Sequence, residues 1–290
     1  MFLPFASAAT CAESSFTLKK ASIPELWFYA ILSKIIMAFK RIVSTILVKD
    51  GLVVKSYGYR QWRPAGRLRS ALQNLDRWLA DEIMVLDVSR KPEIDPKVLA
   101  EIRSAGISTP LIYGGGIRTK DDILRLLDAG CDRLVLESLM WEDSERLNDF
   151  ADLVGTQALI GSLPVTRTAD GIRVFSYPDS ILPNCKLTEA ILHYETLPVS
   201  EILLVDADHE GTAGTGHADT KLLSSELPGK KAFIWFGGLN RVVANELLAQ
   251  PRTAAVAFGN ANFERELNVP ITRDLLLKNR QHAVRGARMK

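Results

Sequence analysis

"LIYGGGIRTKDDILRLLDAGCDRLVLES", residues 111–138, shares its layout with "FIWFGGLNRVVANELLAQPRTAAVAFGN", residues 233–260. In each stretch an apolar run ends at a Gly-Gly pair, a helical pattern follows, and a second apolar run closes the unit. "EIMVLD" from Glu82 likewise resembles "EILLVD" from Glu201. These matches predict a chain built from two similar halves.

The repeat also aligns residues with possible chemistry. Gly115–Gly116 corresponds to Gly237–Gly238, and Glu137–Ser138 corresponds to Gly259–Asn260. Glycines at strand ends let backbone N–H groups approach a phosphate closely. The two halves therefore predict two anion sites on opposite sides of one barrel mouth.

Outward from the repeat, short apolar runs alternate with helical patterns along the chain. Several runs are apolar on both faces, as buried parallel strands are. Eight strands alternating with helices predict a (β/α)8 barrel, which typically needs about 250 residues. An open doubly wound sheet is the alternative, but no G-x-G-x-x-G follows the first strand. The predicted strands are 41–48, 82–87, 109–113, 133–137, 157–163, 201–206, 232–236 and 254–258.

Two helix starts have clear signals. Asp95 followed by Pro96 predicts an N-cap with proline at the first helical position. Thr119 followed by Asp122 has the pattern of a capping box.

Composition narrows the class of protein. The chain is 47% hydrophobic and carries a formal net charge of +2, so it offers no argument for nucleic acid or a membrane as its main partner. The three cysteines, Cys11, Cys131 and Cys185, are far apart and form no C-x-x-C pair. They indicate reduced thiols in a cytoplasmic protein, with Cys131 as a small packed residue.

Residues 1–36 lack the strand–turn–helix rhythm of the rest. They have no basic start, and their apolar run falls short of the roughly 20 residues of a membrane span. We interpret them as an over-long start assignment or a disordered extension, with Met37 as the natural start and 37–290 as a single barrel. An amphipathic packing helix is the alternative.

The segment "KRIVSTILVKDGLVVK", residues 40–55, reads as a strand, a Lys49-Asp50-Gly51 turn and a second strand. The turn could handle a phosphate. The strand from Ile42 to Val48 carries no acid, base or nucleophile, which raises the question of where any chemistry would lie.

The ordered segments "VKDGLVVK", "DEIMVLD", "GGGIRTKDD", "EILLVDADHEGT" and "FGG" resemble the cyclase subunit family of imidazole glycerol phosphate synthase. The resemblance runs from Phe39 to Asp274. It implies a (β/α)8 barrel with a twofold repeat and ammonia supplied by a glutaminase subunit docked on the bottom of the barrel. It also implies a substrate with a phosphate at each end, and no cofactor.

The family closes its imidazole ring with two aspartates that face each other across the mouth and exchange protons. Those positions fall on Leu47 and Pro164 here, and neither side chain can transfer a proton. Asp50, Asp206 and Asp208 are the remaining candidates, although Asp50 has the alternative role of a turn former beside Gly51.

The ligand positions that the resemblance implies are mixed. Gly237, Gly238, Gly259 and Asn260 fit the second phosphate site, whereas Gly115, Gly116 and Ser138 fit the first only in part. Glu137 lies where the family has a neutral amide, and a carboxylate repels phosphate. Lys55 matches the lysine of the family's mobile first loop. The alternatives are glycines that allow close packing and a lysine that is merely solvated.

The family also guards its ammonia channel with four charges at the N-terminal ends of strands. The matching positions are Arg41, Glu82, Arg133 and Glu201, with arginine at 133 in place of a lysine. Alternating cations and anions can satisfy one another around a narrow opening. Four unrelated surface ion pairs are the alternative, and such pairs contribute little.

Three further features of the sequence carry predictions. The first loop is rich in arginine (Arg60, Arg63, Arg67 and Arg69), which predicts an anion or partner contact or simply a solvated surface. "DADHEGT", residues 206–212, predicts no metal site, because consecutive strand residues point to opposite faces. Asp170–Gly171 predicts a hairpin turn.

A charge ring without the proton-transfer pair suggests a barrel that conducts ammonia and no longer makes imidazole. Such cyclase-like relatives are associated with amidation of surface-polysaccharide sugars, beside a glutaminase. One alternative is an active cyclase of histidine synthesis, and a second is a non-catalytic barrel that binds a phosphorylated metabolite.

Overall fold

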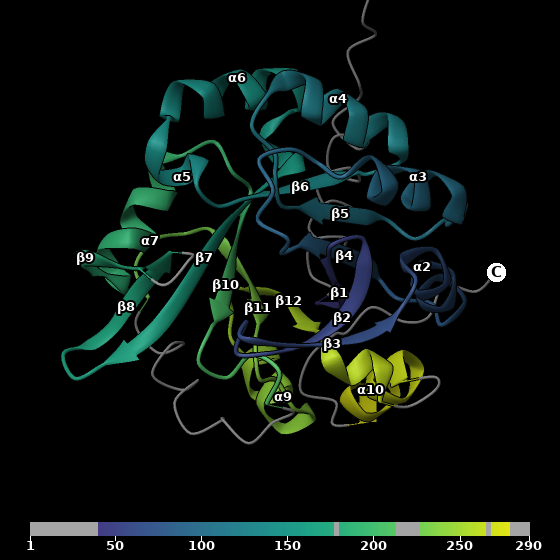
Figure 1. The fold of residues 1–290 in the computed structure, drawn as a ribbon. Helices are drawn as coiled ribbons and strands as arrows, with labels where there is room; N and C mark the ends of the chain where they lie inside the picture. Colours follow the sequence, from purple (N-terminus) through teal and green to yellow (C-terminus); the bar gives the residue numbers. More distant parts are fainter. Residues whose placement is uncertain (1–39, 177–179, 213–226, 265–267, 279–290) are drawn as a thin grey trace, which may run out of the picture. The chain divides into compact units, whose positions relative to one another are not determined.

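Eight parallel strands close into a barrel (Figure 1). The computed structural model describes residues 40–176, 180–212, 227–264 and 268–278, so the predictions for residues 1–36 and for Cys11 lie outside the described residues. Each strand pairs with the next around the ring, and pairing of the fifth with the sixth completes the circle. The strands are β1 (Arg41–Lys49), β4 (Glu82–Asp87), β5 (Leu111–Gly114), β6 (Arg133–Leu136), β7 (Leu159–Thr168), β10 (Glu201–Asp206), β11 (Ala232–Phe236) and β12 (Thr253–Phe258).

Helices lie around the outside of the strands (Figure 1). The connection from β10 to β11 falls largely outside the described residues, and each other connection includes a helix. The helices are α2 (Leu68–Arg77), α3 (Pro96–Ala105), α4 (Lys120–Ala129), the short α5 (Leu139–Glu142), α6 (Ser144–Val154), α7 (Leu187–Thr196), α9 (Arg241–Leu248) and α10 (Asn268–Lys278); the 3-10 turns are η1 (Thr156–Ala158) and η2 (Asn260–Phe263). The (β/α)8 barrel predicted from the sequence is confirmed.

The predicted helix starts are confirmed. The Asp95 carboxylate accepts a hydrogen bond from the Lys97 amide, with Pro96 opening α3. At the start of α4, Thr119 and Asp122 bond reciprocally as a capping box. Such caps satisfy N–H groups that have no partner within the helix.

The predicted strand bounds needed two corrections. β5 begins at Leu111 instead of residue 109. β7 begins at Leu159, after the turn η1, and runs on to Thr168, well past residue 163. The extension occurs because β7 leaves the barrel and pairs with β8 (Gly171–Ser176), which in turn pairs with β9 (Ser180–Lys186). The predicted Asp170–Gly171 turn lies between β7 and β8 and is confirmed.

The second strand predicted after the Lys49–Gly51 turn is confirmed, whereas the following residues, predicted as a loop, complete a β-hairpin. β2 (Leu52–Tyr57) pairs with the end of β1 and with β3 (Gln61–Gly66). The predicted turn at Lys49–Gly51 separates β1 from β2. β-branched and aromatic residues in 52–62 favour strands over loop. We call β2–β3 the lid hairpin.

Two apolar clusters follow from the period of two along each strand. Ile42, Ile46 and Val48 of β1 face the helices and join the larger cluster. Val43 and Leu47 face the axis and join a second cluster with side chains from the other barrel strands. Because every strand is covered on both faces, most of its residues are apolar. Cys131 packs in the outer cluster, as predicted.

Candidate functional site

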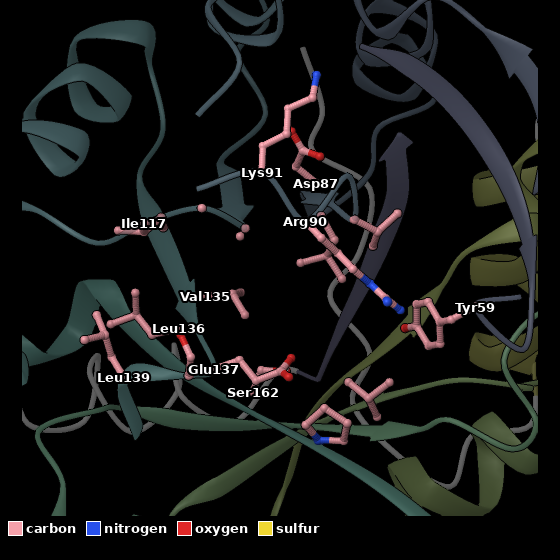
Figure 2. A pocket seen from close by; sticks show the side chains of 18 of the residues that line it. Tyr59, Asp87, Arg90, Lys91, Ile117, Val135, Leu136, Glu137, Leu139 and Ser162 are labelled. Atoms are coloured by element: carbon pink, nitrogen blue, oxygen red, sulfur yellow. The ribbon is translucent and has the colours of Figure 1, made fainter. Parts of the chain in front are cut away.

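A pocket of about 440 Å³ opens at the C-terminal ends of the strands (Figure 2). This is the end at which barrels of this type place their active sites. Its base is apolar and its wall carries several charged groups. The lining side chains used below are Tyr59, Trp62, Asp87, Arg90, Lys91, Arg118, Glu137, Ser138, Ser162 and Pro164, with the backbone of Gly115 and Gly116.

The two positions predicted for proton transfer are apolar and lie at this end of the barrel. Leu47 is 3% exposed and packs in the axial cluster with Val205 and Phe236. Pro164 lines the pocket and pairs in register with Val205. Neither side chain carries a group that can take or give a proton.

Glu137 is the acid that faces this pocket from the end of β6. Its carboxyl points into the pocket (Figure 2), with the Ser162 hydroxyl at a long contact of 3.5 Å. Burial raises the pKa of Glu137 to about 7, although Ser162 and the positive charge of Arg90 act in the opposite direction. A carboxyl with this pKa can donate or accept a proton near neutral pH.

Arg90 was not singled out from the sequence. It lies after β4, and its side chain extends across the pocket toward Tyr59 (Figure 2). Its φ of 59° is uncommon for a residue other than glycine and reflects a sharply turned segment. Sequence offered no signal, because one arginine in a loop is indistinguishable from a solvated one.

The three fallback aspartates do not line the pocket. Asp50 has a φ of 51°, lies in the turn after β1, and approaches Lys91 at 3.6 Å. Arg167 on β7 binds both carboxylate oxygens of Asp206 at 2.9 Å and one oxygen of Asp208 at 3.3 Å. Asp206 and Asp208 therefore brace β10 against the arm that β7 forms beyond the barrel.

The repeated glycines have a packing explanation in both halves. A Cβ at Gly115 would lie 2.3 Å from the carbonyl oxygen of Asp87, and a Cβ at Gly237 would lie 2.4 Å from that of Asp206. Both residues also have positive φ. Asp87 and Asp206 are repeat-equivalent strand ends, so the same close approach recurs and requires glycine in each half.

The two predicted anion sites differ in size. The first half opens onto the 440 Å³ pocket, whereas the hollow at Gly237, Gly238, Gly259 and Asn260 measures about 30 Å³. That volume corresponds to about one or two water molecules. The Asn260 amide is engaged with the lid hairpin, donating to the Ser56 carbonyl at 2.6 Å and accepting from its N–H at 3.2 Å. The second half, whose residues match the family's phosphate site more completely, therefore has the smaller hollow.

The lid hairpin is fixed by a buried carboxyl. Glu210 accepts hydrogen bonds from the Ser56 hydroxyl at 2.7 Å and the Tyr59 N–H at 3.1 Å. Burial raises the pKa of Glu210, against the effect of these donors. Lys55 is half-buried on β2 and does not line the 440 Å³ pocket, whereas Tyr59 and Trp62 do. The hairpin arginines Arg60 and Arg63 are exposed, as are Arg67 and Arg69 beyond the hairpin.

Four charges form a closed cycle at the opposite end of the barrel. Each is the first residue of its strand, and the side chains are 9–22% exposed. Glu201 contacts Arg41 at 2.7 Å and Arg133 at 2.6 Å, while Glu82 contacts them at 3.2 and 3.6 Å. Burial favours neutral carboxyls; the two arginines overcome it at Glu201 and lower its pKa, but at Glu82 burial prevails and raises it.

No group of three or more His, Cys, Asp or Glu side chains is placed to hold a metal within the part of the chain that the structure describes. Among those same residues, no helix is long and apolar enough to cross a membrane.

Comparison with known proteins places this geometry in a family. The family model described as histidine biosynthesis protein matches residues 41–268. The imidazole glycerol phosphate synthase subunit HisF of Natranaerobius thermophilus is 31% identical over 177 residues, 60% of this chain and 70% of that protein. The putative subunits hisF2 of Campylobacter jejuni (31% over 175 residues, 60% and 69%) and Vibrio vulnificus (27% over 177 residues, 59% and 64%) are also similar.

The chain belongs to the histidine biosynthesis protein family, and within it to the HisF group as a divergent paralogue.

Proposed function

We propose that this chain is a cyclase-like barrel subunit that pairs with a glutaminase and conducts ammonia along its axis, and that it does not close the imidazole ring. The observation that carries the proposal is the contrast between the two ends of the barrel. A closed cycle of four ion pairs occupies one end, and apolar Leu47 and Pro164, which the sequence resemblance assigns to the family's proton-transfer positions, lie at the other.

The path between the two ends is consistent with this role. Above the ring, all eight strands contribute apolar side chains to the axis, together with the buried hydroxyl of Thr45 on β1. A neutral NH₃ molecule crosses apolar surroundings at far lower cost than an ion. The acceptor would then be a molecule outside this chain, which we propose to be a sugar of a surface polysaccharide. Two of the relatives are named hisF2, which supports a divergent role.

A direct assay separates this proposal from cyclase activity. The chain from Met37 is supplied with the histidine-pathway substrate and excess ammonium, so that no glutaminase is required, and imidazole glycerol phosphate is measured. We expect no turnover from the folded barrel, with HisF of Natranaerobius thermophilus as the active control. Turnover near one per second, an ordinary enzyme rate, would contradict the proposal.

If turnover is seen, three substitutions locate the proton-transfer group. Asp50→Asn, Asp206→Asn and Asp208→Asn each remove one fallback carboxylate. Arg167 already engages Asp206 and Asp208, and Asp50 does not line the pocket, so we expect none of the three to be the acid or base. Glu137, which lines the pocket with a pKa of about 7, is then the remaining candidate, and Glu137→Gln tests it. Loss of activity in Asp50→Asn, which is exposed and structurally tolerant, would be the clearest evidence for the cyclase alternative.

The partner is tested separately. The chain is mixed with the glutaminase encoded beside its gene, and association and glutamine hydrolysis are measured. We expect binding and faster hydrolysis than by the glutaminase alone. A folded barrel that neither binds nor stimulates any neighbouring glutaminase would refute the ammonia-conducting role. Phosphate-ligand binding without glutaminase contact would instead favour the non-catalytic barrel.

A further inference from the structure

The pocket at the mouth has a carboxyl where its repeat counterpart has none. Glu137 in the first half corresponds to Gly259 in the second. The inward face of β6 places this carboxyl above the ring. From ring to mouth that face reads Arg133, Val135 and Glu137.

The Gly115–Gly116 cradle and Glu137 share one pocket. All three line it, together with Ser138. A phosphate seated on that cradle would meet the Glu137 carboxylate within the same low-dielectric space, where like charges repel strongly. Burial already disfavours the Glu137 anion, and a nearby dianion would disfavour it further.

Other charged and titratable groups surround Glu137 from every side of the pocket. Arg90 faces it across the cavity, and its positive charge lowers the Glu137 pKa against the larger effect of burial. Tyr194 of α7 interacts with it electrostatically from the packed side. The remaining groups that line the pocket are Asp87 at the end of β4, Lys91 after it, Arg118 before α4, and Tyr59 of the lid hairpin.

Apart from Asp87, Arg90, Lys91 and Arg118, the wall around Glu137 offers uncharged polar groups and apolar surface. Ser138 and Ser162 offer hydroxyls, and Tyr59 and Trp62 offer aromatic surface beside the apolar side chains of Leu86, Val88 and Val135. Such a wall combines apolar area with a few placed polar groups, as ligand pockets do. The Glu137 carboxylate then accepts hydrogen bonds from ligand O–H or N–H groups.

We propose that Glu137 determines the ligand class of this pocket: it rejects a phosphate on the Gly115–Gly116 cradle and selects the end of a ligand that presents hydrogen-bond donors, hydroxyl or amino groups. The inference concerns the mouth alone. It holds for an ammonia-conducting barrel or a cyclase. None of its tests involves glutamine, a glutaminase or a reaction product, so the proposed function and the proposal for Glu137 can fail independently.

The anion half of the proposal is tested with inorganic phosphate and with sulfate, which stays a dianion throughout. Binding is followed by the amide resonances of Gly115 and Gly116 in the wild-type chain and in Glu137→Gln, at pH 8 and pH 6. At pH 8 we expect Glu137→Gln to bind both anions up to about tenfold more tightly than the wild type, because protonation of a carboxyl with a pKa of about 7 limits the effect. The difference in sulfate affinity between Glu137→Gln and the wild type should shrink at pH 6, where Glu137 is mostly protonated.

Glu142→Gln is the matched control, because Glu142 is exposed and lies a few residues along the same segment. It should bind anions as the wild type does. Equal affinities of wild type and Glu137→Gln for sulfate at pH 8, or an equal gap at both pH values, would overturn the proposal.

The second half of the proposal, that Glu137 selects hydrogen-bond donors, is tested with two hydroxylated probes at tens of millimolar: glucose, which is neutral, and glucosamine, which is cationic. Both should shift the wild-type resonances of Gly115 and Ser138 more than those of Glu137→Gln. A preference for glucosamine that Glu137→Gln abolishes identifies an amino group as the donor, and equal binding identifies hydroxyls. Failure of both probes to shift the wild-type resonances would overturn this half.

Discussion

Glu137 shows how one residue separates the two halves of a repeat. Its counterpart Gly259 places no side chain in the hollow of the second half, whereas the Glu137 carboxyl faces the pocket of the first half. Comparison of the two halves of the sequence identified glutamate at 137 against glycine at 259, but it did not reveal how the glutamate changes the pocket. Burial of the side chain, the contact with Ser162 and the position of Arg90 together place its pKa at about 7.

The raised pKa of Glu137 predicts a pH-dependent stability. The folded chain holds this proton more tightly than the unfolded chain, so its contribution to stability falls as pH rises from about 4.5 to 7. One pKa unit corresponds to 1.36 kcal/mol, so a rise from 4.5 to about 7 means that Glu137→Gln should raise the free energy of unfolding by about 3 kcal/mol at pH 8 and by little at pH 4.5. Urea unfolding at both pH values measures this.

Glu246→Gln, on an exposed position of α9, is the control and should change neither value. If Glu137→Gln and the wild type show the same pH dependence, Glu137 ionises alike in the folded and unfolded chains.

The lid hairpin illustrates how an element is held by contacts remote in sequence. β2 and β3 pair locally, but their position over the mouth depends on Glu210, which lies more than a hundred residues away. Gly211 lets the lid hairpin pack closely against the segment after β10, since a Cβ at this position would lie 1.9 Å from the Ser56 carbonyl oxygen. Sequence reading predicted a basic loop here because the acidic partner is invisible in the local pattern.

Substitution at this contact should loosen the hairpin alone. Glu210→Gln weakens two hydrogen bonds, each with a net value of about 1 kcal/mol. We expect hydrogen exchange of the amides in 56–59 to accelerate about tenfold, with the barrel strands unchanged. Gly211→Ala should act in the same direction, because its Cβ cannot coexist with the docked hairpin.

Asp50→Asn at the opposite end of the hairpin serves as the control. Its side chain is exposed and its left-handed backbone suits asparagine, so exchange should not change. Acceleration throughout the barrel would show that Glu210 supports the whole fold and not the hairpin specifically.

At the scale of the whole molecule, barrel closure brings together side chains from four strands. Arg41, Glu82, Arg133 and Glu201 are separated in the chain by up to 160 residues, and they form one cycle. Breaking one member of a buried pair leaves its partner uncompensated, which typically costs about 3–5 kcal/mol. The partial exposure of this ring lowers the expected cost to about 2–4 kcal/mol.

The lowered pKa of Glu201 predicts acid sensitivity. The unfolded chain protonates this carboxyl at higher pH than the folded chain does, so its stabilisation is present above about pH 4.5 and is lost as pH falls below it. Glu201→Gln should therefore be less stable than the wild type at pH 6, and the difference should narrow by pH 3. Urea unfolding across this range measures it, with Glu246→Gln following the wild type. A constant difference at every pH would contradict an ionic role for Glu201.

Much of the fold was predictable because its determinants are local. Alternation of apolar runs with capped helical patterns indicated eight strands, and Asp95 and Thr119 marked helix starts that the structure confirms. The internal repeat indicated the twofold arrangement of glycines. The end of β7 was predicted too short, because its extension depends on pairing with β8 and not on its own sequence.

By itself the sequence determined the barrel, its internal repeat, and the apolar residues at 47 and 164. It also determined which four residues form the ring of charges. Tertiary structure alone decided which groups face one another. It paired Asp206 with Arg167, gave Arg90 and Glu137 a common pocket, and left the better-matched anion site with space for about one or two water molecules. The physical reason is that charge, burial and distance act through space, and a pKa or a cavity depends on neighbours that the chain order does not reveal.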